Sequence, residues 1–260
     1  MKFNIVITCK DRYKYLIRNL FYINIANRDQ KHDVNVYTMC NQEYNASGFK
    51  NLNIVSGYIE DRDKLFNKSK YLNKAISKMD QNYDYFIQWD ADLVMNPDLF
   101  DMIEKSNAEW IVLSGEKLTK ESTEYFFEKM LKWDNIKLLG KNNKSIRENK
   151  MNRFVGNISI RKDTLEKYMN ILKLDKLYNE NFLGWGGEDS MLSITSSKMM
   201  AHGILKKVYF YDAWEHLFHE REVDKTNFDR RQQEKNVILL NNQLILNDNR
   251  IREYMSSDEK

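Results

Sequence analysis

Two aspartates separated by one alanine could together bind a divalent cation. Asp90 and Asp92 follow the apolar run Tyr83–Trp89, which is typical of a buried strand. Because side chains alternate along a strand, both carboxylates are predicted to point to the same side. Neighbouring carboxylates repel each other and are tolerated when a cation lies beside them. Mn²⁺ or Mg²⁺ could bridge them to a diphosphate; the alternative is a solvated turn after a strand.

Two histidines near the other end of the chain are candidate ligands for the same cation. His216 and His219 are half of the four histidines in the sequence. At this i, i+3 spacing they could share one face of a helical turn, and imidazole is a common metal ligand. A single histidine is more often an ordinary core or surface residue. Within the two pairs we favour His219 and Asp92 as ligands.

A glycine-rich stretch surrounds a tryptophan in the segment Asn181–Leu192. The chain has only nine glycines, yet Gly184, Gly186 and Gly187 all lie beside Trp185. Glycine permits backbone conformations closed to other residues and lets a ligand approach the main chain. The flat apolar face of Trp185 is the kind of surface on which a sugar ring stacks.

Two carboxylates follow this cluster at the start of a predicted helix. Asp189 could act as a general base that removes a proton from an acceptor hydroxyl, while Glu188 orients the acceptor by hydrogen bonds. Acidic residues are also favoured in the first turn of any helix, by capping and by the helix dipole. The tryptophan among the glycines favours the functional interpretation.

Alternating strands and helices over about the first 115 residues would position these groups. This alternation predicts an α/β fold with a mostly parallel central sheet, helices on both faces, and ligands beyond the carboxyl ends of the strands. Asp11 is the predicted cap of the first helix. The expected strands are Phe3–Cys9, Asp33–Cys40, Leu52–Gly57, Tyr83–Trp89 and Ala108–Gly115, and the expected helices cover 11–27, 63–79 and a short stretch after Pro97.

The second half is less regular. It predicts an amphipathic helix over Thr119–Trp133, a helix from Glu188 to Ala201 and a final helix from Phe228 to about Leu246. The expected strands are Arg153–Ile160 and Ile204–Asp212. The polar segments 140–152 and 220–227 are candidate lids, or simply exposed connections.

The composition limits the classes of function that we expect for this chain. The net charge of +3 is spread over 41 basic and 38 acidic residues, so no nucleic-acid-binding face is expected. No run reaches the roughly 18 apolar residues of a membrane span, and no signal peptide is recognised. We expect a soluble, cytoplasmic chain with Cys9 and Cys40 reduced in the core, which could still act peripherally on a membrane-bound acceptor.

Five segments, in order, resemble the β-1,4-galactosyltransferase group and its bacterial relatives, including capsule-building and chondroitin-polymerase-type glycosyltransferases of the GT-A fold. The resemblance covers roughly residues 3 to 230. It implies one GT-A domain over residues 1–260, with a nucleotide-sugar part over about 1–115 and an acceptor and metal-histidine part over about 150–246. The segments are IVITCKDRYKYLIRNLFYI, LFNKSKYLNKAISKMDQNYDYFIQWDADLV, RFVGNISIRKDTLEKYMNI, ENFLGWGGEDSML and HLFHER.

The resemblance implies three groups of site residues. Those that would hold the uridine diphosphate (UDP) sugar are Thr8, Lys10, Arg12, Phe66, Lys68 and Asp90. Those that would bind Mn²⁺ or Mg²⁺ are Asp90, Asp92, His219 and His216. Those on the acceptor side would be Trp185, Gly187 and Glu188, with Asp189 as catalytic base.

The implied activity is metal-dependent transfer of a hexose or N-acetylhexosamine, with inversion, from a UDP-sugar to a hydroxyl of a glycan or lipid-linked sugar. The acceptor would be a surface glycan or its lipid-linked precursor. Two departures separate the chain from the vertebrate enzymes: Thr8 and Cys9 replace proline and phenylalanine, and Ser190 and Met191 interrupt the acidic run after the base. The resemblance therefore predicts the fold and the mechanism of this chain better than its donor sugar or its acceptor.

Three alternatives stay open at this point. Phe86–Val94 also resembles the strand and aspartate pair of haloacid-dehalogenase-type phosphatases, although that strand is normally the first of its domain. An inactive sugar-nucleotide-binding module on the same fold would keep the same residues. A retaining enzyme like the polypeptide N-acetylgalactosaminyltransferases carries a similar WGGE segment, usually followed by asparagine; Asp189 favours inversion.

Overall fold

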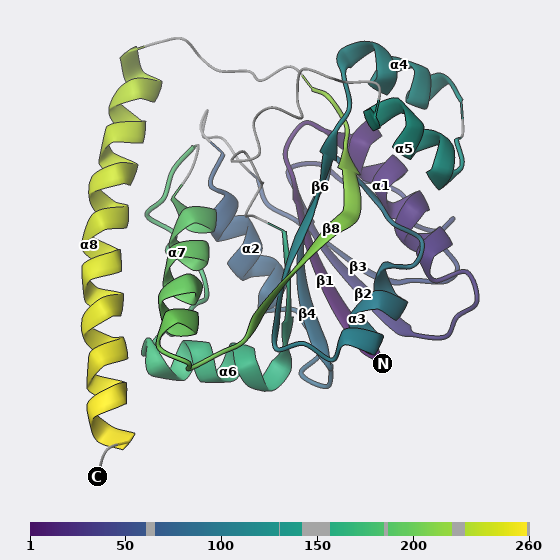
Figure 1. Ribbon diagram of the computed structural model, residues 1–260. Helices are drawn as coiled ribbons and strands as arrows, with labels where there is room; N and C mark the ends of the chain where they lie inside the picture. Colours follow the sequence, from purple (N-terminus) through teal and green to yellow (C-terminus); the bar gives the residue numbers. More distant parts are fainter. Residues whose placement is uncertain (61–65, 130, 142–156, 185–186, 220–226, 259–260) are drawn as a thin grey trace.

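A single curled sheet forms the centre of the computed structural model, which describes residues 1–260 except 61–65, 130, 142–156, 185–186, 220–226 and 259–260 (Figure 1). The strands are β1 (Lys2–Cys9), β2 (Asp33–Cys40), β3 (Asn53–Tyr58), β4 (Tyr85–Asp90), β5 (Leu93–Met95), β6 (Trp110–Lys117), β7 (Ile158–Arg161) and β8 (Lys207–His216). The helices are α1 (Tyr13–Ala26), α2 (Lys68–Ile76), α3 (Leu99–Ser106), α4 (Lys120–Glu128), α5 (Trp133–Lys141), α6 (Lys162–Ile171), α7 (Glu188–Ala201) and α8 (Asn227–Asp258).

The sheet has a parallel half and a mixed half. Its strand order is β3-β2-β1-β4-β7-β6-β8-β5. The pairings among β3, β2, β1 and β4 are all parallel, as the alternation of strands and helices predicts. β7 runs antiparallel to both β4 and β6, and β5 runs antiparallel to β8. The expected α/β fold is confirmed, and the antiparallel pairings belong to the less regular second half.

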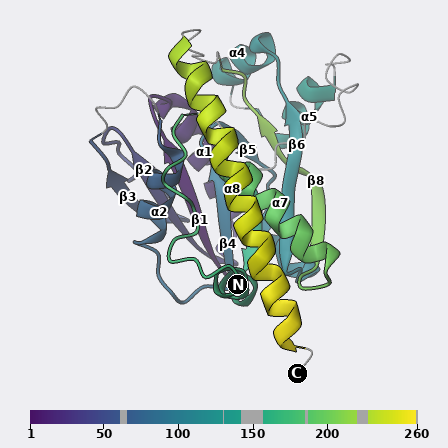
Figure 2. The same cartoon turned by 90° about the vertical axis from the view of Figure 1, so that its left-hand side faces the viewer.

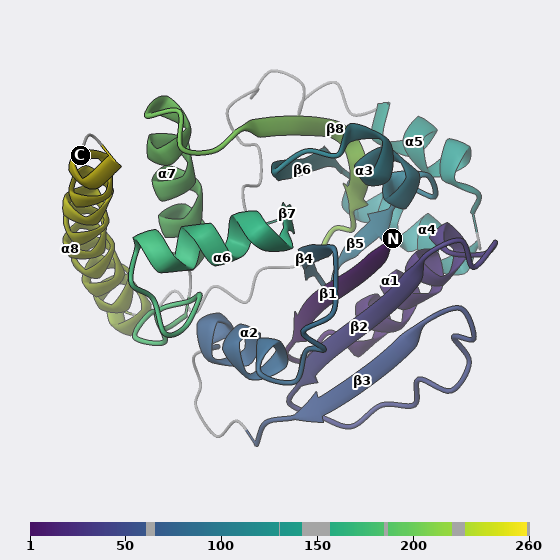
Figure 3. The ribbon, with the colours of Figure 1, turned by 90° about the horizontal axis from the view of Figure 1, so that it is seen from below.

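Helices cover both faces because residues along the central strands alternate between two cores. In β1, Ile5 and Ile7 pack in one cluster with α1 and α3, whereas Val6 packs in another with α2, α6 and α7. Figure 3 shows α1 and α2 on opposite sides of β1. Burial of each such side chain contributes about 1.5–3 kcal/mol, so these two layers hold the carboxyl ends of the strands in place.

Two helices differ in extent from the sequence expectation. The segment Thr119–Trp133 contains only α4, because Lys129 adopts an extended conformation and the chain starts a second helix, α5, at Trp133. Phe126 of α4 and Ile136 of α5 then join one cluster. The last helix continues to Asp258 and lies beside α7 (Figure 2). It continues past the polar residues after Leu246 because Asn247 and Ile251 are both buried, and Asn247 donates a hydrogen bond to Thr195 of α7.

Two local expectations are wrong. Asp11 does not cap α1: Arg12 occupies the N-cap position without a side-chain hydrogen bond, and the Asp11 carboxylate accepts from Asn41 instead. The strand expected to end at Asp212 continues to His216, so the two histidines do not share a helical turn. Residues 214–216 stay extended because they pair with β5 on one side and β6 on the other.

Several expectations fall on residues that the structure leaves undescribed. The first part of the strand expected over Arg153–Ile160 is among them, and β7 begins at Ile158. Most of the two candidate lids, 140–152 and 220–227, is outside the described residues as well. Within the described part of the chain, no helix combines the length and apolar character needed to cross a membrane.

Candidate active site

The buried carboxylate of Asp92 lies among three basic side chains. Its own side chain is 5% exposed, and Arg12 Nη1 lies 2.8 Å from Oδ2. His219 Nε2 is 2.9 Å from the same oxygen, and His216 Nε2 is 3.7 Å from Oδ1. Two histidines predicted from spacing alone therefore meet one of the two predicted aspartates.

Backbone pairing brings these residues together. β5 pairs antiparallel with the end of β8, and Leu93 is the register partner of His216. The amide of Leu217 donates to the carbonyl of Asp92 at 2.9 Å. Beyond it, Phe218 is held by hydrogen bonds to Thr123 and Tyr15 from two further helices. The position of His219 thus depends on strand and helix contacts far from it in sequence.

The charge states of this group suit a cation. Burial alone raises the pKa of Asp92, but His216, His219 and Arg12 outweigh it and hold that pKa well below its usual range. Burial lowers the pKa of His216, more than Asp92 raises it. Asp92 is therefore ionised and His216 neutral near pH 7, which are the protonation states in which each ligates a metal.

The donor atoms of Asp92, His216 and His219 all lie within 4.8 Å of one another. One carboxylate and two imidazoles are a donor set that could hold a divalent cation. Asp90 is not in this group. β4 ends at Asp90 and a turn follows, so the strand alternation that was expected to align the two aspartates does not reach Asp92.

Asp90 instead shares a lysine with Asp189. Lys68 Nζ lies 3.0 Å from Asp90 Oδ1 and 2.9 Å from Asp189 Oδ2. The Lys68 side chain is 14% exposed, and the two carboxylates are 26% and 29% exposed. Burial alone lowers the pKa of Lys68, but Asp189 and Asp90 raise it above its ordinary value, so the bridging group is an ammonium.

Besides Lys68, two asparagines hold Asp90 by hydrogen bonds. Asn157 accepts from the Asp90 amide at 2.9 Å and donates to its carboxylate at 3.2 Å. Asn19 of α1 donates to the Asp90 carbonyl at 2.7 Å. Thr8, another predicted donor-site residue, is the register partner of Asp90 on β1. The carboxyl ends of β1 and β4 therefore form one edge that carries several predicted site residues.

Asp189 is also held by Gln88, a residue that was not among the predicted site residues. Gln88 Nε2 donates to Asp189 Oδ1 at 2.8 Å, and Tyr178 donates its hydroxyl hydrogen to Gln88 Oε1. Gln88 lies two residues before Asp90 on β4, so strand alternation from Asp90 could have indicated it. Tyr178 is in the connection between α6 and α7, and no sequence signal points to it.

Glu188 and Gly187 begin α7. Glu188 is 5% exposed, and burial, with the charge of Asp189, raises its pKa to about 7. Gly187 has a φ of +113°, and a Cβ there would lie 2.2 Å from the ring of Phe182. The chain thus needs glycine here to turn into the helix close to an aromatic ring. Trp185 and Gly186 are outside the described residues, so the stacking role of Trp185 stays a prediction.

The remaining predicted donor residues lie around this edge. Lys10 directly follows β1, and Phe66 precedes α2 and packs edge-on against Tyr71. The carbonyl of Phe66 accepts from the amide of Gly184 at 2.9 Å, which joins the start of α2 to the glycine-rich stretch. Main-chain as well as side-chain contacts thus join the segments predicted to bind the donor and the acceptor.

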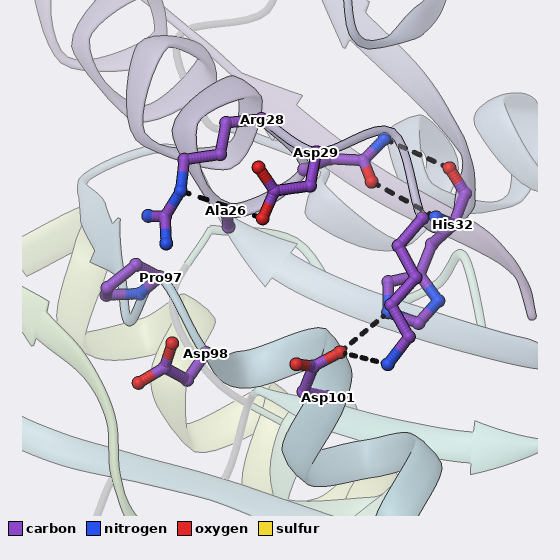
Figure 4. A pocket seen from close by; sticks show the side chains of 9 residues that line it. Ala26, Arg28, Asp29, His32, Pro97, Asp98 and Asp101 are labelled. Atoms are coloured by element: carbon purple, nitrogen blue, oxygen red, sulfur yellow. Dashed lines mark hydrogen bonds and ion pairs between the residues drawn. The ribbon is translucent and has the colours of Figure 1, made fainter.

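A second group of potential ligands lies away from these residues. His32, Asp101 and Glu104 offer donor atoms within 4.8 Å of one another. Asp101 and His32 line a small pocket of about 50 Å³, in which Figure 4 shows them joined. Lys31 Nζ lies 2.7 Å from both carboxylates of this group and supplies the positive charge there.

Comparison with known proteins identifies the fold. No family model and no curated protein matches the sequence significantly. Among solved structures, the catalytic domain of Drosophila β1,4-galactosyltransferase 7, in complex with xylobiose, is similar with a TM-score of 0.50 and 16% identity over 90% of this chain and 80% of that one.

Staphylococcus aureus TarS, residues 1–349, is similar with a TM-score of 0.57 and 13% identity, over 98% of this chain and 71% of that one. Its complex with UDP-GlcNAc is similar with a TM-score of 0.57 and 12% identity, over 98% and 72%. The expected fold is thereby confirmed: the chain has the fold of GT-A-type glycosyltransferases.

Proposed function

We propose that this chain is a metal-dependent inverting glycosyltransferase, which moves a hexose or N-acetylhexosamine from a UDP-sugar to a hydroxyl of a carbohydrate. The observation that carries the proposal is the shared contact of Asp90 and Asp189 with Lys68. It joins the aspartate motif predicted for the donor side to the carboxylate predicted to act on the acceptor. The GT-A fold and the UDP-GlcNAc complex of TarS support a nucleotide-sugar donor.

The greater exposure of Asp189 than of Glu188 supports Asp189 as the general base. It is 29% exposed, whereas its neighbour Glu188 is 5% exposed. In the proposed step Asp189 takes the proton of the acceptor hydroxyl as that oxygen attacks the anomeric carbon. The bond from this carbon to the diphosphate oxygen breaks with its electron pair, UDP departs, and the single displacement inverts the configuration.

Two basic residues that follow β1 would bind the diphosphate. Arg12 and Lys10 follow β1, and Arg12 already pairs with Asp92. Asp92, His216 and His219 would hold Mn²⁺ or Mg²⁺, whereas Asp90 pairs with Lys68. A bound divalent cation supplies neutralisation of the charge on the departing diphosphate.

The acceptor is proposed to be a carbohydrate, as a surface glycan or its lipid-linked precursor. The galactosyltransferase 7 domain, which shares the fold, was crystallised with xylobiose. Glu188 would contribute a hydrogen bond to the acceptor only through the small exposed part of its side chain, and Trp185 would stack on the sugar.

A UDP-release screen tests the proposal. The donors are UDP-galactose, UDP-N-acetylgalactosamine, UDP-glucose and UDP-N-acetylglucosamine, each with Mn²⁺, with EDTA, and with the Asp189→Asn variant. We expect release with at least one donor, loss with EDTA, and a fall of about 10²–10⁴-fold in the variant. A generic phosphate ester is the control: its hydrolysis, without UDP release, would instead favour the phosphatase alternative.

A further inference from the structure

Both oxygens of the Asp189 carboxylate have a donor. Gln88 Nε2 lies 2.8 Å from Oδ1, and Lys68 Nζ lies 2.9 Å from Oδ2. The two donors come from different elements, β4 and α2, whereas Asp189 belongs to the first turn of α7. A carboxylate fixed at both oxygens cannot rotate about its last bond, so its free lone pairs keep one direction.

The amide of Gln88 is itself held in the orientation that this contact needs. Gln88 is fully buried, and its Oε1 accepts the hydrogen bond of the Tyr178 hydroxyl. Burial raises the pKa of Tyr178 well above its ordinary value, so the phenol stays protonated and can only donate to this carbonyl oxygen. With Oε1 committed to Tyr178, Nε2 must face Asp189.

Tyr178 is anchored to the helix that carries Lys68. Asn73 of α2 accepts from the amide of Tyr178 at 3.2 Å and donates to its carbonyl at 2.8 Å. Tyr178 is 1% exposed. Asp189 is therefore connected to α2 in two ways, by the hydrogen bonds through Gln88 and Tyr178 to Asn73 and by the ion pair with Lys68.

We propose that Gln88, oriented by Tyr178, is a positioning residue that aims the Asp189 carboxylate at the acceptor hydroxyl. This inference rests on the proposed function, in which Asp189 is the base. A reacting group displaced by about 1 Å can cost roughly 10²-fold in rate. Loss of the Gln88 donor therefore lowers kcat and leaves binding of the UDP-sugar unchanged, because the side-chain hydrogen bonds of Gln88 in the described structure go to Asp189 and Tyr178 and not to the predicted ligands of the metal or the diphosphate.

If Gln88 and Tyr178 had a purely structural role, removing their hydrogen bond without loss of packing would leave kcat unchanged. Gln88 and Tyr178 could exist only to satisfy each other's buried polar atoms. Replacing both partners by apolar side chains of similar shape is nearly neutral for stability. The double variant Gln88→Met with Tyr178→Phe thus removes the hydrogen-bonded pair, keeps the packing, and leaves Asp189 Oδ1 without its donor.

The experiment measures kcat, KM for the acceptor, Kd for UDP-sugar with Mn²⁺, and Tm. For the folded double variant we expect kcat to fall about 10- to 100-fold, with Kd within twofold of wild type. Gln88→Met alone also removes the donor to Asp189 Oδ1, so it should lower kcat similarly and stands in if the double variant does not fold. Tyr168→Phe, a buried tyrosine of the same core cluster, is the matched control and should retain kcat.

The outcomes separate the two proposals. A folded double variant or Gln88→Met with wild-type kcat overturns the positioning role while leaving the glycosyltransferase proposal intact. A parallel rise in Kd for UDP-sugar would also overturn it, because Gln88 would then act on donor binding. Wild-type protein with neither UDP-sugar binding nor UDP release overturns the proposed function itself.

Discussion

Asp90 and Asp189 lie on either side of one buried ammonium, 3.0 Å and 2.9 Å from Lys68 Nζ. One carboxylate ends the central strand β4 and the other begins α7. Without the lysine, the two negative charges would repel each other at this partly exposed site. The predictions below start from this contact.

Replacing Lys68 by methionine should destabilise the fold. We expect the free energy of unfolding to fall by about 1–3 kcal/mol, below the roughly 3–5 kcal/mol for a fully buried pair, because both carboxylates are more than a quarter exposed. Urea denaturation measures the change. Lys70→Met, at an exposed position of the same helix, is the control. Equal effects of the two substitutions would show that the ion pairs of Lys68 contribute nothing specific.

Removing an imidazole should weaken cation binding. His219→Ala is expected to raise the Kd for Mn²⁺ by at least about 10-fold, since it removes one of three clustered donor groups. Isothermal titration calorimetry measures this. His202→Ala, at an exposed histidine, should leave Kd unchanged, and His32→Ala tests the second group. If His32→Ala abolished Mn²⁺ binding and His219→Ala did not, the assignment of the metal site would be wrong.

Glu188 should make the stability of the fold depend on pH. Its pKa is raised to about 7 in the folded chain, against an ordinary value of 4.5. Below pH 4.5 it is protonated in both states and has no effect. Between pH 4.5 and 7 the unfolded chain releases this proton more readily, so stability falls with rising pH, by about 3 kcal/mol in all. Above pH 7 this penalty stays constant.

The variant Glu188→Gln removes the titrating group and should flatten this part of the stability profile. Urea denaturation at several pH values from 4.5 to 8 compares it with wild type. Glu166→Gln, on the exposed face of α6, is a control that should keep the wild-type slope. An unchanged slope in Glu188→Gln would mean that Glu188 is ionised in the folded chain throughout this range.

Gly187 should not accept a side chain. Its φ of +113° and the 2.2 Å approach of a Cβ to Phe182 both disfavour alanine, so Gly187→Ala is expected to lower the free energy of unfolding by about 1–3 kcal/mol. Gly203→Ala has a positive φ but open space and should cost less, and Gly48→Ala should be nearly neutral. Thermal unfolding ranks the three; a Gly187→Ala variant as stable as Gly48→Ala would contradict the strained turn.

Much of the fold follows from short-range patterns. The apolar run of β1 and the spacing of Leu16, Leu20 and Ile23 on α1 predict those elements nearly to their ends, because alternation and the helical period are visible within a few residues. The break at Lys129 and the extension of α8 are not visible in this way. They depend on which residues, such as Ile136 and Ile251, find a place in a core built from distant segments.

The residue types of the site could be predicted, but not its contacts. Asp92 meets His216 because β5 pairs with β8, and that short strand carries too little local signal to be recognised. The bridge through Lys68 and the donor Gln88 likewise join residues that are far apart in sequence.

Local patterns are therefore enough to predict the α/β order of elements, the acidic pair at a strand end and the carboxylates at the start of a helix, because each depends on the chemistry of a few consecutive residues. That Asp90 contacts Lys68 while Asp92 contacts two histidines becomes visible only in the folded chain. The partners of a side chain are set by strand register and by packing between layers, which are properties of the whole sheet.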